Sequence, residues 1–246
     1  MKRLIVHIMP VLLVCLAGGS AAQPTVMQIG ANRYRFVGPS DRLVADSIQV
    51  LDAALLEEQE ELERTLGFSM PPAVVIVAGD ANAFRQITGQ QGHVAAIYRP
   101  RDDLLIFQNP HGLRRAGILQ VTVRHELCHR AAATLSSGGG SHANWVEESV
   151  CEAYARSERA DCAPLRAAIH DQVIGLVDYA DLSRVVGSAL GSIRAEERRT
   201  GFCVAIDWGQ HLIARHGLRA SLALSARPDL PELAESFAGF QARWSD

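Results

Sequence analysis

Lysine is almost absent from this chain: Lys2 is the one lysine among 24 basic residues, and all the others are arginine. The arginines are scattered among 27 acidic residues without forming a basic stripe, and the formal net charge at pH 7 is -3. Proteins that bind nucleic acids usually carry a basic patch or an excess of positive charge. The sequence therefore gives no indication of a nucleic-acid partner.

The sequence also lacks an apolar run of the roughly 20 residues that a membrane-spanning helix needs. Its first residues combine a short basic start, an apolar segment from Leu4 to Ala17 that Pro10 interrupts, and small residues up to Ala22. This order is typical of a secretory signal peptide. We expect cleavage near Ala22 to remove residues 1–22 and to leave an exported protein, periplasmic or secreted, with no stable membrane insertion.

No internal repeat or linker divides the remaining chain, and 48% hydrophobic with 21% charged residues is typical of a globular protein. We therefore expect one domain over residues 23–246. The patterns run from a long helix through strands to further helices, which predicts an α+β fold: a small mixed sheet followed by a helical region. Expected strands are Tyr34–Gly38, Val74–Val77, Val94–Tyr98 and Leu104–Gln108, and expected helices begin near Ser40, Leu113, Asn144, Arg166, Phe202 and Leu230.

Four cysteines remain after the signal peptide: Cys128, Cys151, Cys162 and Cys203. An even number in an oxidising compartment suggests disulfides, and four cysteines allow three pairings that the sequence does not rank. Because Cys128 and Cys151 lie within the segments that carry the candidate site, they could instead be packed thiols. We expect at least one disulfide.

The segment Arg124–Arg130 reads RHELCHR and contains an H-E-x-x-H motif. On a helix, His125 and His129 project from one face and can offer their imidazoles to one ion, while Glu126 lies beside them. We expect the flanking arginines to be surface charges or outer partners of the site. A catalytic zinc site uses three protein ligands and leaves the fourth position to water, so a third ligand is the test of the motif.

A second acidic segment supplies that ligand. Glu148 follows His129 by nineteen residues, in WVEESVCEAYA, which predicts a helix. This distance lets the first helix end, a glycine-rich loop turn, and a second helix return antiparallel to the first. Glu152 lies one helical turn after Glu148, where its carboxylate can accept a hydrogen bond from the second nitrogen of a ligand histidine.

These two segments resemble the gluzincin metallopeptidases, the thermolysin-like clan, and in particular stand-alone peptidase-MA-like domains. In the aminopeptidase branch the second motif reads W-L-x-E-G-x-A-E, and here it reads W-V-E-E-S-V-C-E, which aligns Trp145, Glu148 and Glu152. Ser149 replaces the usual glycine. The resemblance implies a zincin-like fold and hydrolysis of a peptide or protein substrate.

The resemblance also implies the roles of the residues. His125, His129 and Glu148 would bind Zn2+, Glu152 would orient a ligand histidine, and Glu126 would be the general base. A tyrosine or histidine stabilises the developing oxyanion in relatives. The available candidates for this role are His211, Tyr179 and Tyr154.

The substrate would lie along an edge strand of the sheet. Leu104–Gln108 could be that edge, or a plain strand within the sheet. The G-x-M-E-N sequence with which aminopeptidases of this clan hold a free amino terminus is absent, which favours an endopeptidase.

Two other functions are compatible with the sequence. A binding module could keep the fold and the metal without turnover, although Glu126 would then have no purpose. A cell-envelope scaffold without metal could contain the motif by chance, because a lone H-E-x-x-H is more often an ordinary helix surface than a zinc site.

Overall fold

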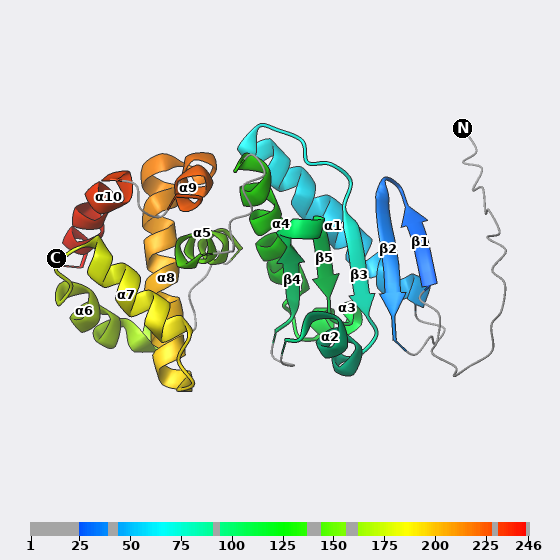
Figure 1. Ribbon diagram of the computed structural model, residues 1–246, viewed down its shortest axis with the longest axis horizontal. Coiled ribbons are helices and arrows are strands. Elements are labelled where there is room, and N and C mark those ends of the chain that lie inside the picture. Colours follow the sequence, from blue (N-terminus) through cyan, green and yellow to red (C-terminus); the bar gives the residue numbers. More distant parts are fainter. Residues whose placement is uncertain are drawn as a thin grey trace.

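The computed structural model describes residues 25–38, 44–90, 94–136, 144–155, 162–227 and 231–244. The expected signal peptide and its cleavage site lie outside these ranges. None of the described helices is both long and apolar enough to cross a membrane. Figure 1 shows a sheet with long helices against it, formed by the first half of the chain, beside a group of helices formed by the second. This is the expected α+β order, in which a small mixed sheet precedes a helical region.

The sheet has five strands in the order β1-β2-β3-β5-β4. They are β1 (Thr25–Ile29), β2 (Asn32–Val37), β3 (Val74–Ala78), β4 (Ala96–Arg99) and β5 (Leu104–Phe107). The central strands β2, β3 and β5 are parallel, and β1 and β4 run antiparallel to them at the two edges. β1 adds to the four strands expected from the sequence.

The strand Leu104–Gln108 does not form an edge. β5 lies between β3 and β4, and all of its residues are buried, as is usual for a strand covered on both faces. The edge next to it is β4, whose residues are less buried. The assignment of Leu104–Gln108 to the edge is therefore wrong, and the alternative of a plain strand is confirmed.

Helices cover both faces of this sheet. Val75, Val77 and Leu105 point into a large apolar cluster with α1 (Val44–Leu66) and α4 (Leu119–Leu135). The alternate residues, among them Ile76 and Ile106, form a smaller cluster with α2 (Ala81–Thr88) on the other face. A short helix, α3 (Pro110–Arg115), precedes α4. The period of two along each strand thus fixes which face receives α4, the helix of the H-E-x-x-H motif.

The second half of the chain forms α5 (Trp145–Ala155), α6 (Arg166–Ile174), α7 (Tyr179–Leu190), α8 (Ala195–His216), α9 (Leu218–Ser225) and α10 (Pro231–Ala242). The large apolar cluster continues through these helices as far as Phe240 in α10. α5 packs closely on α8, because a Cβ atom at Gly209 would lie only 2.0 Å from the carbonyl oxygen of Ser149. The glycine therefore sets how near α8 can approach α5.

Both disulfides lie in or next to these helices. Cys128 of α4 is joined to Cys151 of α5, and Cys162, just before α6, is joined to Cys203 of α8. The expectation of at least one disulfide is confirmed. Cys128 and Cys151 are not packed thiols.

The two arginines that flank the motif anchor α4 in the fold. Arg130 is only 1% exposed, and its Nε and one terminal nitrogen donate to the two carboxylate oxygens of Asp103, each at 2.8 Å. Asp103 lies in the turn between β4 and β5. Arg124 makes a similar two-bond pair with the buried Glu58 of α1. The pairs fix α4 against the edge hairpin and against α1, so Arg130 in particular is not a surface charge.

We expect Asp103→Asn to lower the free energy of unfolding by about 3 kcal/mol, because it leaves the buried Arg130 guanidinium without a charged partner. Asparagine tolerates the positive φ of 46° at this position, so the backbone adds little to the loss. Denaturant unfolding measures the change. Asp102→Asn is the matched control: its pair with Arg99 is about half exposed and should contribute less than about 1 kcal/mol. Equal losses in the two variants would show that the Arg130–Asp103 pair contributes no more to stability than an exposed ion pair.

Candidate metal centre

The candidate metal ligands come from two helices. α4 carries His125 and His129 one turn apart, so their imidazoles project from the same face. α5 carries Glu148 in its first turn. In Figure 1, α5 lies across the direction of α4 rather than alongside it, which differs from the antiparallel arrangement expected from the sequence.

The three side chains nevertheless meet at one point. Nε2 of His129 lies 3.0 Å from Nε2 of His125 and 3.2 Å from one carboxylate oxygen of Glu148, and the other oxygen lies 3.6 Å from Nε2 of His125. Ligand atoms bonded to a tetrahedral ion at about 2.0–2.1 Å are separated by roughly 3.3 Å. The observed spacings bracket this value, so His125, His129 and Glu148 could hold one metal ion.

Two further carboxylates lie behind the histidines. Oε1 of Glu147 lies 2.7 Å from Nδ1 of His129, and Oε1 of Glu152 lies 3.7 Å from Nδ1 of His125. An outer carboxylate of this kind fixes the ring and directs Nε2 toward a metal. The sequence identified Glu152, which lies beyond hydrogen-bond distance here, and missed Glu147, which makes the short contact.

The charges of the site are strongly coupled. Burial opposes protonation of His129, but hydrogen bonds to Glu147 and Glu148 outweigh it and raise the pKa of His129 to about 10. Burial would raise the pKa of Glu148, yet the hydrogen bond from His129 and the two imidazoles lower it to about 2. In the absence of a metal, a proton on His129 thus balances the Glu148 carboxylate.

Glu126 lies beside this cluster and is almost fully buried. Burial raises the pKa of its carboxyl, against the lowering effect of the two histidines and of the backbone of Tyr98 in β4. A buried carboxyl with a raised pKa next to metal ligands has the properties of a general base or acid.

The cluster opens into a cleft of about 910 Å³. β4 and its flanks border the cleft through Ala95, Ala96, Ile97 and Tyr98, and the start of α4 contributes Ile118, Val121 and Thr122. The opposite helices contribute Leu190, Arg198 and Phe202. Apart from the three candidate ligands and the glutamates around them, Arg198 is the charged side chain among the described residues of this lining. The cleft is otherwise mainly apolar.

The candidates for oxyanion stabilisation lie elsewhere. None of His211, Tyr154 and Tyr179 belongs to the described lining of the cleft. Nε2 of His211 lies 2.9 Å from the carbonyl oxygen of Ser236, and its ring stacks on Trp208. His211 therefore contributes to the packing between α8 and α10.

The two tyrosines are packed in a similar way. Tyr179 lies against the rings of Trp145 and Trp208. Tyr154 lies near Arg124 and Glu58, and burial raises its pKa to about 12. Other polar donors do line the cleft, namely Gln90, Tyr98, Thr122, Ser136 and Arg198, and the sequence did not identify them.

Comparisons with known proteins do not assign the chain to a family: no family model matches it, and no significant match appears among curated proteins.

Proposed function

We propose that this protein is an exported, zinc-dependent metallopeptidase of the gluzincin type. The observation that carries the proposal is the convergence of His125, His129 and Glu148 at metal-ligand spacing, with Glu126 beside them in an open cleft. Two imidazoles and one carboxylate form a set that suits Zn2+ and leaves a coordination position free. The two disulfides, which are typical of exported proteins, support the export part of the proposal.

In this proposal, zinc bound to the three ligands would lower the pKa of a water molecule toward about 7 and polarise the scissile carbonyl. Glu126 would accept a proton from the attacking water and then donate it to the departing amine. Glu147 accepts a hydrogen bond from Nδ1 of His129, which keeps the lone pair of Nε2 directed at the site.

The shape of the cleft supports a peptide or protein as the substrate. β4 is an edge strand of the described sheet and borders the cleft, so it can pair with an extended backbone. Apolar side chains such as Ile118 and Phe202 can contact the substrate's own side chains. Arg198 can donate to a carbonyl or carboxylate. The absence of a G-x-M-E-N segment favours cleavage within chains over removal of the first residue.

A metal-binding module without turnover is the second candidate. The observation that favours it is the position of His211, Tyr154 and Tyr179 outside the described lining of the cleft. A peptidase needs a donor for the developing oxyanion, and another polar residue of the cleft, such as Arg198, Tyr98 or Thr122, would have to fill that role.

Metal removal tests the proposed activity. We expect the purified mature protein to contain about one zinc ion per chain and to cleave an unstructured protein such as casein. Incubation with 1,10-phenanthroline followed by desalting should abolish cleavage, and stoichiometric Zn2+ should restore it. Zinc binding without cleavage would support the binding module, and the absence of both would refute the proposal.

Zinc binding should also depend on pH in a defined direction. Because the pKa of His129 is about 10 in the metal-free site, its ring holds a proton at pH 8 that zinc must displace. We expect release of at least one proton per ion, and an affinity that rises about tenfold or more per pH unit between pH 7 and 9. Calorimetry in buffers of different ionisation enthalpy counts the protons. An affinity that does not change between pH 7 and 9 would contradict this coupling.

A further inference from the structure

The disulfide between Cys128 and Cys151 lies close in sequence to the candidate metal ligands. Cys128 is the residue before His129 on α4, and Cys151 is one helical turn after Glu148 on α5. Both cysteines are fully buried, and their Cα atoms are 5.4 Å apart. The bond therefore joins the helix that carries two ligands to the helix that carries the third.

We infer that the Cys128–Cys151 disulfide is a positioning element of the metal site, and that it sets zinc affinity by holding Glu148 in place. The inference rests on the proposed function only for the identity of the metal. His125 and His129 lie on the same helix, which fixes their spacing. Glu148 reaches them only if α4 and α5 keep their positions relative to one another, which we call their offset. A ligand displaced by more than about 0.5 Å no longer has the geometry that a bound ion needs.

The polar contacts across this helix interface change when an ion binds. Glu126 on α4 and Glu147, Glu148 and Glu152 on α5 line the same cleft, so four carboxylates gather where the two helices meet. Among the described residues, His125 and His129 of α4 make polar contacts with Glu147, Glu148 and Glu152 of α5. Protonation or metal binding changes those same contacts. The disulfide joins the two helices covalently with and without the ion, whatever happens to those polar contacts. It therefore reduces the reorganisation needed when the ion binds.

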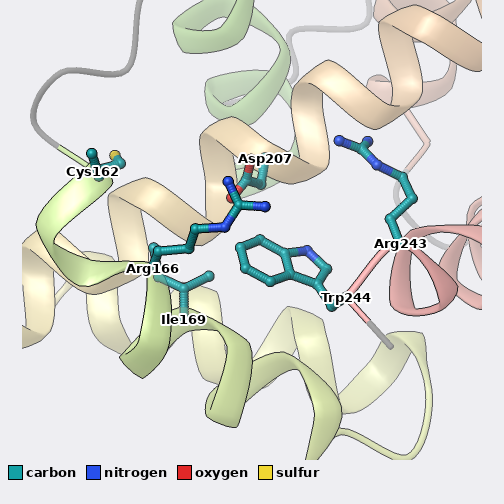
Figure 2. A pocket seen from close by; sticks show the side chains of 7 residues that line it. Cys162, Arg166, Ile169, Asp207, Arg243 and Trp244 are labelled. Atoms are coloured by element: carbon teal, nitrogen blue, oxygen red, sulfur yellow. The ribbon is translucent and has the colours of Figure 1, made fainter. Parts of the chain in front are cut away.

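The chain offers a matched control in its second disulfide. Cys162–Cys203 closes a longer segment, with a sequence separation of 41 against 23, so the chain-entropy model gives it the larger share of stability. It belongs to a different region. Figure 2 shows Cys162 at a small cavity with Arg166, Asp207, Arg243 and Trp244. The described residues that line this cavity are not among the described residues that line the metal cleft.

The test compares two paired variants of the full chain, Cys128→Ala/Cys151→Ala and Cys162→Ala/Cys203→Ala. Zinc affinity is measured by competition with a chromogenic chelator, and stability by thermal unfolding of the metal-free proteins. We expect the first pair to weaken zinc binding about 10- to 100-fold, as the loss of an outer partner does. The second pair should change zinc affinity less than about threefold, although its melting temperature falls by at least as much.

The outcomes separate this inference from the proposed function. If the wild type binds no zinc, the metal site itself is refuted. If the wild type binds zinc and both pairs bind it equally well, the Cys128–Cys151 bond serves only stability and the inference is overturned. If the first pair does not fold, Cys128→Val/Cys151→Ala restores apolar volume at the helix interface and takes its place in the same comparison.

Discussion

Glu126→Gln should lower kcat/KM for peptide cleavage by about 1,000-fold while zinc remains bound with unchanged stoichiometry. The substitution keeps the size of the side chain but removes the group that accepts and returns the proton. Because Glu126 is not one of the three converging ligands, the ion loses none of its protein contacts. Steady-state cleavage of a fluorogenic peptide, together with zinc content from the same sample, measures both quantities.

The control for this variant is Glu57→Gln, the same chemical change at an exposed position of α1. It should leave cleavage unchanged. Cleavage by Glu126→Gln at the wild-type rate would exclude Glu126 as the base. Loss of zinc from Glu126→Gln would instead show that its carboxylate belongs to the metal site.

Glu148→Gln should weaken zinc binding by more than about 100-fold, because it removes the charge of the one ligand that α5 contributes. The neighbouring glutamates provide graded comparisons. Glu147→Gln should cost about 10- to 100-fold, since Glu147 makes a 2.7 Å contact with Nδ1 of His129. Glu152→Gln should cost less, because its carboxylate is 3.7 Å from Nδ1 of His125.

The order of these three effects distinguishes the structure from the sequence-based hypothesis. The sequence identified Glu152 as the outer partner, whereas the structure favours Glu147. A larger loss for Glu152→Gln than for Glu147→Gln would support the sequence-based assignment. Wild-type affinity in Glu148→Gln would remove the third ligand from the site.

The local part of the site was predictable because it depends on one helix. The spacing of His125 and His129 follows from helical geometry alone, and the distance to Glu148 limited the choice of a third ligand. Glu147 was missed because successive residues on a helix point about 100° apart, so its direction depends on how α5 crosses α4. The crossing is set by packing at contacts such as Gly209 against Ser149, which no local pattern reveals.

For His211, the sequence suggested a role in the site that the structure does not support. A histidine within a helix can face a cleft or a packed interface, and its sequence neighbours do not distinguish the two. Here Trp208 and Phe240 surround it, and the second of these comes from a distant helix. The donors that do line the cleft, such as Arg198, lacked any signal because they meet the site only through tertiary structure.

The order of helices and strands along the chain was predictable, but which of them lie next to one another in space was not. The apolar and alternating segments gave four of the strands, and the helical periods gave the long helices. The position of β5 inside the sheet was harder to predict because strand order does not follow chain order. A run of four apolar residues, Leu104–Phe107, was nevertheless a signal for a strand covered on both faces. The pairing of the cysteines likewise required the fold, since the sequence allowed three connectivities.

Anomalous diffraction at the zinc absorption edge, from crystals grown with one equivalent of Zn2+, tests the metal site most directly. We expect a single strong peak about 2.0–2.1 Å from Nε2 of both His125 and His129 and about 2.0–2.2 Å from an oxygen of Glu148. A peak elsewhere, or a Glu148 side chain turned away from an ion bound by the histidines, would contradict the proposed metallopeptidase site.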